Sequence, residues 1–558
     1  MNTDYLGSDA PAMRVDLPSE LSERVEFTDA LTRLVADQVA SNIFAFDATL
    51  WGAAAQPEAS VRLGWTDVDP AARELIPAID ELREAFAAQG VNRFVLCGMG
   101  GSSLGPAVIA QWAGIELTML DSTDPAAVAR ALEGDLSRTA VIVSSKSGST
   151  IETRSHLDTF EQAFTDAGIT PSERVVIVTD PGSPLEQQSR AADRHVFLAD
   201  PNVGGRFSVL TAFGLVPAGL AGADIAGLVA AGTAVRDELA LNTPTNPALR
   251  LAAAIYAGLP ARFVLAVNED ASARWGLGRW AEQLVAESTG KDGLGVLPIA
   301  LPDDAPEFDR VPASAVVVRV TADAGAAGAA DAAADAGSGS QGLTVAGNLG
   351  AQFLLWEVAT AALGRLMGID PFNQPDVESA KIAARAALAE LDGTEAATTV
   401  TAAGDVTVLA APAGAAANTA AEIAATLREI TPRDGYLAVQ AYVDPAGELR
   451  EPLERLRTVL ARELGVPVSL GYGPSYLHSV GQLHKGGPAQ GAFLQISDPG
   501  EEDLAIAQSE TSFGTLISAQ ARGDRGVLIE RGRPVLAIAL AQRDTSVLEQ
   551  LITEFTAA

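Results

Sequence analysis

The sequence predicts an α/β protein with two doubly wound, mostly parallel sheets that follow a helical N-terminal segment. The chain has 558 residues, which exceeds what one hydrophobic core usually supports, so two domains, or three, are expected. Short apolar segments bounded by turn residues alternate with helical stretches of about ten residues, which is typical of βαβ units in a parallel sheet. This alternation occurs in both halves of the chain, so two similar α/β halves are the predicted architecture.

The predicted elements fall into consecutive segments. Residues 1–90 are predicted to be helical, because apolar side chains recur at helical spacing in LSERVEFTDALTRLVADQVA and in ARELIPAIDELREAFAAQ. The first α/β domain spans 91–235, with the candidate strands FVLCG, LTMLDS, AVIVSS, VVIVTD and HVFLAD. A helical connecting segment at 236–310 carries the sequence ESTGK. The second α/β domain spans 311–558, with the candidate strands VVVRVT, TVLAAP, YLAVQAYV, VSLGYG, AFLQIS and VLAIAL. An Ala/Gly/Asp-rich stretch at 322–342 is predicted to be an exposed loop inside this domain.

Composition argues against several classes of protein. Apolar residues make up 48% of the chain and charged residues 20%, which predicts a folded globular protein. The net charge of −33 argues against a nucleic-acid partner, because binding a phosphate polymer normally needs a basic face. No run of about eighteen apolar residues occurs and no signal peptide is visible, so no membrane partner is expected. Cys97 is the one cysteine, which excludes an internal disulfide and fits a reducing, cytoplasmic compartment.

Lysine is rare enough in this chain to be informative. Lysine and arginine together number 38, and the lysines among them are Lys146, Lys291, Lys381 and Lys485. Each of these lysines lies in a glycine-rich or polar motif. Because arginine meets the general need for surface cations, the lysines indicate places where a compact, mobile ammonium is required.

Two predicted strands run into loops suited to bind an anion. FVLCGMGGSSLGP places a glycine-rich turn between a strand and a helix, where free N–H groups and the helix dipole favour a phosphate. A purely structural turn is an equal alternative for this loop. AVIVSSKSGSTIETRSH places several hydroxyls and Lys146 at the same point of a later unit, more than the one or two hydroxyls that a helix N-cap needs. With no nucleotide or metal motif nearby, the predicted ligand is a phosphorylated sugar.

Motifs between about residues 94 and 495 resemble those of one family. They are GMGGSSLG, SKSGSTIET, VGGRFSVLTAFG, AESTGKDG, GIDPFNQPDVESAK and YLHSVGQLHKGG. Together they resemble the sugar isomerase fold and the glucose-6-phosphate isomerase family, in particular the isomerase part of bacterial fusions with transaldolase. Residues 1–90 are too few for a transaldolase barrel. The resemblance implies reversible conversion of glucose 6-phosphate to fructose 6-phosphate through ring opening and an enediolate, without a metal or cofactor.

The resemblance also assigns the residues of the reaction. Moving a proton between C2 and C1 needs one base beside both carbons, and Glu287 in ESTGK matches the family's base. The developing enediolate needs a fixed cation, and Arg206 in GGRFS matches the arginine that supplies it. Lys381 matches a lysine that contacts the ring oxygen. Glu152 matches the carboxylate that orients a histidine for ring opening.

The same resemblance assigns the substrate's phosphate to the two anion-binding loops. Gln374 matches a glutamine that lies near the phosphate. The residues that are implied to bind the phosphate are Gly101, Ser102, Ser145, Lys146, Ser147 and Thr150.

The histidine for ring opening has two candidates. No histidine lies between the ESTGK and DVESAK motifs, where the resemblance would place it. We predict His478, which precedes the HKGG sequence, and keep His484 as the alternative. His156 and His195 are predicted to be structural. In the family this histidine often comes from a neighbouring subunit, which implies a homodimer with shared sites.

Two other functions are compatible with the sequence. One is another aldose–ketose phosphate isomerase, for example one that also accepts mannose 6-phosphate. The other is a non-catalytic sugar-phosphate sensor on the same fold. Such a sensor would keep the SKSGST loop but would not need Glu287, Arg206 and Lys381 together.

Overall fold

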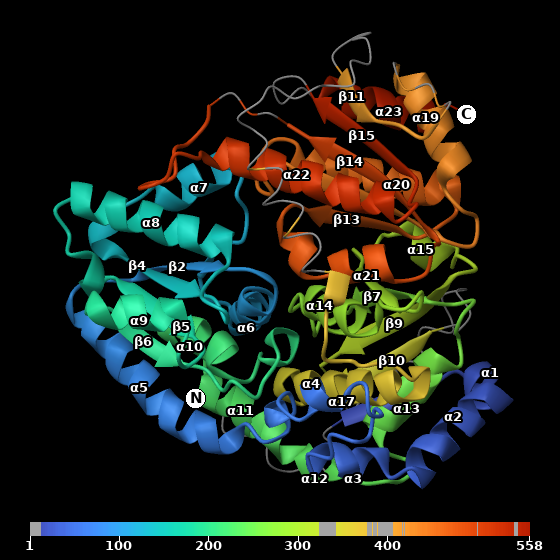
Figure 1. Cartoon of the computed structure of the whole chain (residues 1–558). Coiled ribbons are helices and arrows are strands. Elements are labelled where there is room, and N and C mark those ends of the chain that lie inside the picture. The colour runs from blue at the N-terminus through green and yellow to red at the C-terminus, as the bar shows by residue number, and fades with distance from the viewer. Residues whose placement is uncertain are drawn as a thin grey trace.

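Three sheets and the helices that cover them form the framework of the chain (Figure 1). The structure is a computed structural model that describes residues 13–322, 342–376, 382, 388, 406–413, 415, 417, 419–498, 500, 502–540 and 545–557. Each sheet is five-stranded, and the sheets are mostly parallel. The predicted α/β class with mostly parallel sheets is therefore confirmed, whereas the strands form three sheets and not two.

The first sheet is fully parallel and has the order β3-β2-β4-β5-β6. Its strands are β2 (Arg93–Gly98), β3 (Thr118–Leu120), β4 (Thr139–Ser144), β5 (Val175–Thr179) and β6 (His195–Leu198), and each overlaps a candidate strand of the sequence. The strand order reverses between β2 and β4, because β3 lies on one side of β2 and all later strands lie on the other. Ligands of open α/β sheets bind at the carboxyl ends of such a strand pair.

Helices cover both faces of the first sheet. They are α5 (Asp69–Ala88), α6 (Leu104–Ala113), α7 (Pro125–Leu132), α8 (Ile151–Asp166), α9 (Pro184–Ala191) and α10 (Ala212–Ala221). Alternate side chains of a strand point to opposite faces. Val95 and Cys97 accordingly pack into the core with α7 and α8, while Leu96 packs into the core with α5 and α10.

The middle sheet has the order β1-β10-β9-β7-β8, with β1 antiparallel to β10. Its strands are β1 (Met13–Asp16), β7 (Val264–Glu269), β8 (Leu297–Ala300), β9 (Ala315–Thr321) and β10 (Leu343–Gly347). The helices that share its core are α2 (Val25–Ala36), α13 (Pro247–Tyr256), α14 (Leu277–Thr289) and α17 (Leu349–Met367).

The middle sheet corrects the predicted domain boundaries. The segment 236–310, predicted to be a helical connection, contributes β7 and β8. β8 is four residues long and contains Pro298, so pairing with β7 and not local propensity makes it a strand. The segment 1–90 holds helices as predicted, but it also contains β1. The predicted loop at 322–342 lies outside the described residues except for its two end residues.

The third sheet has the order β11-β15-β14-β12-β13, with β11 antiparallel to β15. Its strands are β11 (Val406–Ala410), β12 (Tyr436–Tyr442), β13 (Val468–Tyr472), β14 (Gly491–Ser497) and β15 (Val535–Leu540). One core contains side chains of this sheet and of α19 (Ala420–Ile430), α20 (Arg450–Leu464) and α23 (Ser546–Thr556). Another core is shared between the third and the middle sheet, and the predicted second domain at 311–558 is thus divided between these two sheets.

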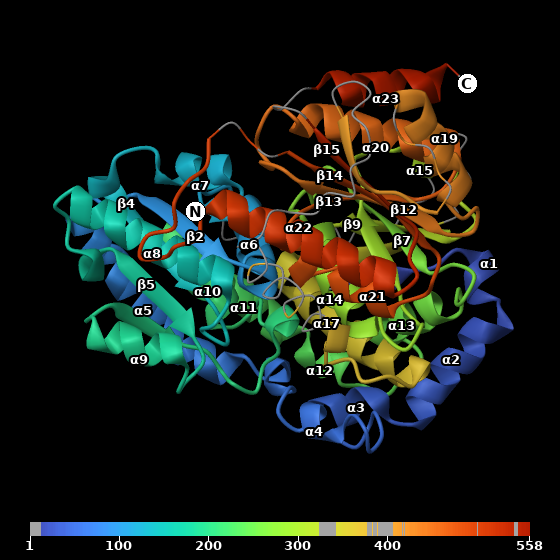
Figure 2. The ribbon, with the colours of Figure 1, turned by 45° about the horizontal axis from the view of Figure 1, so that its top comes forward.

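One long helix connects the third sheet with the first. α22 (Phe513–Glu530) places Ile517 and Ala521 in the core between the middle and third sheets. Its first turn places Phe513 and Leu516 in the core of the first sheet. Figure 2 shows α22 crossing the molecule from the first sheet toward α21 (Gly481–Gly486).

Short helices and 3-10 turns complete the described chain. They are α1 (Ser19–Ser22), α3 (Val39–Phe44), α4 (Gln56–Ala59), α11 (Ile225–Ala234), α12 (Arg236–Leu239), α15 (Pro306–Asp309), η1 (Gly64–Thr66), η2 (Gly100–Ser102), η3 (Leu136–Arg138), η4 (Pro171–Glu173), η5 (Gly205–Phe207) and η7 (Ser475–His478). Within the described parts of the chain, every helix is too short or too polar to cross a membrane.

Candidate active site

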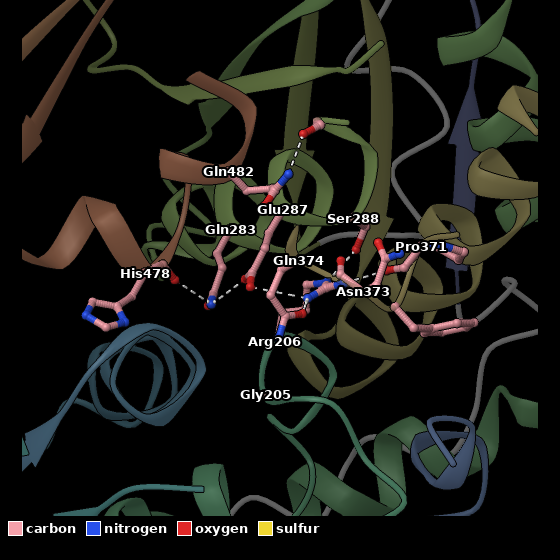
Figure 3. Close-up of polar contacts among 12 residues, drawn as sticks. Gly205, Arg206, Gln283, Glu287, Ser288, Pro371, Asn373, Gln374, His478 and Gln482 are labelled. Carbon is pink, nitrogen blue, oxygen red and sulfur yellow. Dashed lines mark hydrogen bonds and ion pairs between the residues drawn. The ribbon is translucent and has the colours of Figure 1, made fainter. Parts of the chain in front are cut away.

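Segments from all three sheets meet at the carboxyl end of β2. The turn η2 follows β2, and it contacts η5, which carries Arg206, and η7, which carries His478. Helix α14 of the middle sheet contacts the same turn and carries Glu287. Figure 3 shows Glu287 between Arg206 and Gln283, with His478 on the far side of Gln283.

The glycine-rich turn after β2 makes this convergence possible. Gly100 has a φ of +56°, and a Cβ there would lie 2.5 Å from the carbonyl oxygen of His478. A Cβ on Gly101 would lie 2.0 Å from the carbonyl oxygen of Gly205. Only glycine permits backbones to approach this closely, so the turn holds the His478 and Arg206 segments against the end of β2.

Arg206 is buried, with 3% of its surface exposed, and its guanidinium is held by hydrogen bonds. Its Nε–H donates to Ser288 Oγ at 2.8 Å, and its Nη1–H donates to Gln374 Oε1 at 2.9 Å. Its Nη2–H groups donate to the carbonyl oxygens of Pro371 at 2.6 Å and Asn373 at 3.1 Å. Burial lowers the pKa of Arg206 from its usual value, but a guanidinium stays protonated in proteins. Arg206 is therefore a fixed cation.

Glu287 faces this cation. Its Oε1 lies 3.3 Å from Nη1 of Arg206, and 7% of the residue is exposed. Gln283 lies one turn earlier on α14, and this spacing places both side chains on one face of the helix. The Gln283 amide donates to Glu287 Oε2 at 3.0 Å and to the carbonyl oxygen of His478 at 2.8 Å. The carboxylate is thus oriented, shielded from water and linked to the histidine segment.

His478 pairs with Glu152, which lies in the first turn of α8. Nε2 of His478 is 3.1 Å from Oε1 of Glu152. Burial raises the pKa of Glu152, but the charge and hydrogen bond of His478, a backbone hydrogen bond and His156 together lower it by more, so the pKa lies below its usual value. Glu152 is therefore a buried, ionised carboxylate that fixes one nitrogen of the histidine ring.

His484 lies in the hydrophobic core and not at this site. Its Nδ1 is 2.9 Å from the Tyr436 hydroxyl, and its ring packs against Tyr436 and Phe493. Burial, with the charge of Lys485 second, lowers its pKa to about 3. A histidine in this setting stays neutral at physiological pH, so the geometry favours His478 as the residue for ring opening.

Of the other two histidines, His156 packs inside the fold and His195 is partly buried. His156 is buried, and its Nε2 lies 3.0 Å from the carbonyl oxygen of Ser122. Its ring stacks on Phe513 at a centroid distance of 5.8 Å. His195 lies edge-on to Phe86 at 5.7 Å. These contacts agree with the prediction that both are structural.

The two predicted phosphate loops begin side by side. β2 and β4 are paired with Gly98 opposite Ser144, so the turns that follow these residues leave the sheet at the same edge. In the second loop the Ser145 hydroxyl donates to Thr150 Oγ1 at 3.2 Å, while Ser147 is exposed. In the first loop Gly101 is buried and Ser102 is partly exposed.

Lys146 has a partner that the sequence did not indicate. Its Nζ forms an ion pair with Asp180 Oδ2 at 2.5 Å, and about a quarter of its side chain is exposed. Burial raises the pKa of Asp180, and this effect outweighs the lowering effect of the lysine. The Lys146 ammonium is thus held by the Asp180 carboxylate, and an anionic ligand in the loop could compete with this carboxylate for the ammonium.

Comparisons with known proteins agree with this architecture. The phosphoglucose isomerase family model matches residues 67–292. The glucose-6-phosphate isomerase of Rubrobacter xylanophilus is 31% identical over 377 residues, which cover 56% of this chain and 86% of that relative. The chain belongs to the glucose-6-phosphate isomerase family. The probable glucose-6-phosphate isomerase of Haloarcula marismortui is 38% identical over 209 residues, which cover 37% of this chain and 48% of that relative.

Other relatives and solved structures extend this picture. The chain spans about half the length of several curated glucose-6-phosphate isomerases that it matches. A hypothetical protein of Thermus thermophilus superposes with a TM-score of 0.56 and 26% identity, covering 68% of this chain and 100% of that one. A glucose-6-phosphate isomerase from Chlamydia trachomatis superposes with a TM-score of 0.53 and 19% identity, over 66% and 87% of the two chains, which shows a shared fold.

Of two further residues assigned through the glucose-6-phosphate isomerase family, the structure describes Gln374 but not Lys381. Gln374, expected near the phosphate, accepts the Nη1–H of Arg206 and is itself exposed. Lys381 lies outside the described residues, so its contact with the ring oxygen stays a prediction.

Lys291 supports the Arg206 cluster. Its Nζ donates to the carbonyl oxygens of Asp370 and Asn373, both at 2.6 Å, and to Asn373 Oδ1 at 2.8 Å. These contacts hold the loop whose carbonyl groups also bind Arg206. Burial, followed by the nearby charge of Arg206, lowers the pKa of Lys291 to about 7.

Gln283, Ser288 and Gln520 are site residues that the sequence reasoning missed. Gln283 could have been found, because it stands one helical turn before Glu287. Ser288 follows Glu287 directly, inside the ESTGK motif. Gln520 lies 368 residues from its partner Glu152 and had no local signal.

Lys485 is as deeply buried as Lys291, but its partner is a buried carboxylate. Its Nζ forms an ion pair with Asp524 at 2.5 Å, and both side chains are almost completely buried. Asp524 also accepts the Tyr476 hydroxyl at 2.6 Å. This network ties α22 to the segment that carries His478.

Among the residues that the structure describes, no group of three or more His, Cys, Asp and Glu side chains could hold a metal ion. The expectation that the chain works without a metal or cofactor stays a prediction.

Proposed function

We propose that this chain catalyses the reversible isomerisation of glucose 6-phosphate and fructose 6-phosphate, through ring opening and an enediolate intermediate. One observation carries the proposal: a buried carboxylate, Glu287, lies 3.3 Å from the fixed cation Arg206 and is joined by Gln283 to the segment of the His478–Glu152 pair. Base and cation thus face each other, and the backbone of the ring-opening acid is tied to the base through Gln283.

Glu287 is the proposed base for proton transfer. It takes the proton from C2 of the open-chain sugar, and the C–H electrons form the C1–C2 double bond while the C1 carbonyl becomes the enediolate oxygen. The carboxyl group then returns the proton to C1, and the proton of the C2 hydroxyl passes to the C1 oxygen as the C2 carbonyl forms. Its two oxygens are oriented by Arg206 and Gln283, so the carboxylate does not need to reorganise during the reaction. Exclusion of water keeps the proton on the carboxyl group between the two transfers.

Arg206 is the proposed stabiliser of the enediolate. Its hydrogen-bond donors are held by Ser288, by Gln374 and by backbone carbonyl groups. It therefore acts as a preorganised positive charge near the site where negative charge develops. Gln374 is exposed, so a substrate oxygen could replace it as the acceptor for Nη1–H.

His478 is the proposed acid for ring opening. Its Nε2 faces Glu152, which leaves Nδ1 to give a proton to the ring oxygen. Lys381 is proposed to contact the same ring oxygen. The substrate's phosphate is proposed to lie at the two loops that leave the first sheet, on Gly101, Ser102, Ser145, Lys146, Ser147 and Thr150.

A coupled assay of fructose 6-phosphate conversion tests the proposal. We expect the wild-type chain to be active and Glu287→Gln to lose activity by a factor of about 10² to 10⁴, because an amide cannot carry the proton. Glu74→Gln, an exposed position on α5, is the control and should keep full activity. An inactive wild type, or an active Glu287→Gln, would contradict the proposal. The same assay with mannose 6-phosphate shows whether the substrate range is wider.

We also propose a homodimer and a cytoplasmic location, because the family resemblance implies both. The pairing of His478 with Glu152 within one chain means that this contact does not need a neighbouring subunit. Light scattering during gel filtration measures the oligomeric state, and a monomer with full activity would show that the site is complete in one chain.

A further inference from the structure

A second set of buried polar side chains lies behind the His478–Glu152 pair. Gln520 on α22 is 3% exposed, and its Nε2–H donates to Oε1 of Glu152 at 2.8 Å. This is the same oxygen that lies 3.1 Å from Nε2 of His478. The hydroxyl of Thr123, which is fully buried, donates to Oε1 of Gln520 at 2.7 Å. The four side chains form one continuous hydrogen-bonded chain.

The chemistry of these groups fixes which way the Gln520 amide points. An ionised carboxylate can only accept hydrogen bonds, so Glu152 must face the NH₂ of the amide. The amide oxygen then faces Thr123, whose hydroxyl can donate to it. A flipped amide would set its oxygen against the carboxylate oxygen and leave a buried repulsion. Glu152 therefore enforces one orientation of Gln520, and the Thr123 hydroxyl satisfies the amide oxygen that this orientation turns away from the carboxylate.

A neutral donor suits this position. Glu152 is buried, and burial alone would raise its pKa and favour the uncharged acid. A hydrogen bond from Gln520 favours the ionised form without placing a second positive charge next to His478. A lysine or arginine here would compete with the imidazolium for the carboxylate. An amide donates a hydrogen bond to the carboxylate without adding a charge near the His478 ring.

The anchoring of α22 makes Gln520 a rigid support. Phe513 and Leu516 of this helix pack in the core of the first sheet, which also carries Glu152 on α8. Ile517 and Ala521 pack in the core between the middle and third sheets. Gln520 lies between these two contacts, so its amide is held at a set distance from the carboxylate.

We propose that Gln520 is a positioning residue for ring opening, which holds the Glu152 carboxylate ionised and oriented toward His478, and that Thr123 holds the Gln520 amide in place by donating to its oxygen. This role rests on the proposed isomerase function. Gln520 acts through Glu152 and does not touch the substrate.

The first test replaces the amide. Gln520→Leu should lower kcat about tenfold with KM changed less than twofold, because it removes one hydrogen bond to a charged group that acts in the reaction. It should also move the acid limb of the kcat–pH profile to higher pH, because Glu152 loses a donor that favours its ionised form. A merely structural role would not move the pH profile.

The second test uses a matched pair at the other end of the chain of hydrogen bonds. Thr123→Val removes the hydroxyl at nearly constant volume, while Thr123→Ser keeps it. We expect Thr123→Val to shift the pH profile in the same direction as Gln520→Leu by a smaller amount, and Thr123→Ser to match the wild type. If Gln520→Leu does not fold, this pair decides the question alone.

Each outcome has a distinct meaning. The inference is overturned, and the proposed function stays intact, if the wild type is active and Gln520→Leu has the same kcat and pH profile. If Gln520→Leu does not fold, the same result in Thr123→Val overturns the inference. A wild type without isomerase activity overturns the proposed function itself. A tenfold loss of kcat without a shift of the acid limb also overturns the inference, since it would mark Gln520 as structural only.

Discussion

At the scale of residues, the site gathers positive charge around one buried carboxylate. Glu287 lies against Arg206, and Lys291 holds the loop that also binds this arginine. The lowered pKa of Lys291, about 7, shows that burial and the neighbouring guanidinium make a second full charge costly there. Local positive charge within a chain of net charge −33 is suited to an enediolate and a phosphate, both of which are anionic.

The buried histidine His484 gives a prediction about acid stability. Its folded pKa of about 3 is depressed below the usual 6.5, so between these values the unfolded chain binds more protons at this site than the folded chain. Its contribution to stability is therefore lost as the pH falls from 6.5 toward 3. We expect His484→Gln to reduce the loss of unfolding free energy between pH 7 and pH 4.5 by about 2–3 kcal/mol.

Urea denaturation at a series of pH values measures this difference. The buried His156, with a pKa of about 4, titrates in both proteins and should leave a common acid slope. Equal pH dependence in His484→Gln and the wild type would show that His484 does not titrate in the way that its burial implies.

At the scale of elements, the turn η2 sets how closely the site segments approach. Gly101→Ala should destabilise the fold by about 2 kcal/mol, because the new Cβ would meet the backbone oxygen of Gly205, which cannot move as a side chain could. Gly205→Ala is the matched control on the other side of the same contact, since a Cβ there meets no described atom within 4 Å. Chemical denaturation should separate the two variants, and equal stabilities would show that η2 and η5 can separate without cost.

The same scale shows what the sequence could predict of the fold. Each strand of the first sheet overlaps a candidate strand, because each is a short apolar segment bounded by turn residues. β1, β7, β8 and β10 were not among the candidate strands; β7 is a short apolar run like those of the first sheet, whereas β1 depends on a partner that is distant in the chain. β1 pairs with β10, so the antiparallel edge of the middle sheet joins residues near opposite ends of the segment 13–347. Local patterns do not contain that pairing.

The candidate site was predictable to the extent that its residues lie in local motifs. Arg206, Glu287 and His478 each stand in a short distinctive sequence, and the structure brings all three to one turn. Gln520 has no such context, because α22 is an ordinary amphipathic segment and its contact with Glu152 exists only in the folded chain. A tertiary hydrogen bond across 368 residues leaves no trace in spacing or composition.

At the scale of the whole molecule, shared cores join the three sheets, and α22 contributes side chains to two of these cores. Its first turn is buried with the first sheet, and later turns are buried between the middle and third sheets. Glu152 comes from the first of these parts, whereas His478 and Gln520 follow strands of the third. The alignment of the ring-opening pair therefore depends on how firmly these parts are joined.

Phe513→Ala tests this dependence. Phe513 is fully buried in the first-sheet core and begins α22, so truncation should cost about 3–5 kcal/mol and loosen the helix that carries Gln520. Phe555→Ala is the matched control, because Phe555 is equally buried but lies in the outer core of the third sheet. Both variants should show similar losses in urea denaturation. At a temperature where both variants stay folded, only Phe513→Ala should lower kcat, by about tenfold, because a displaced Gln520 weakens the Glu152–His478 pair. The same variant should show faster amide exchange in α22. Equal kcat values in the two variants would mean that the site keeps its geometry without this anchor.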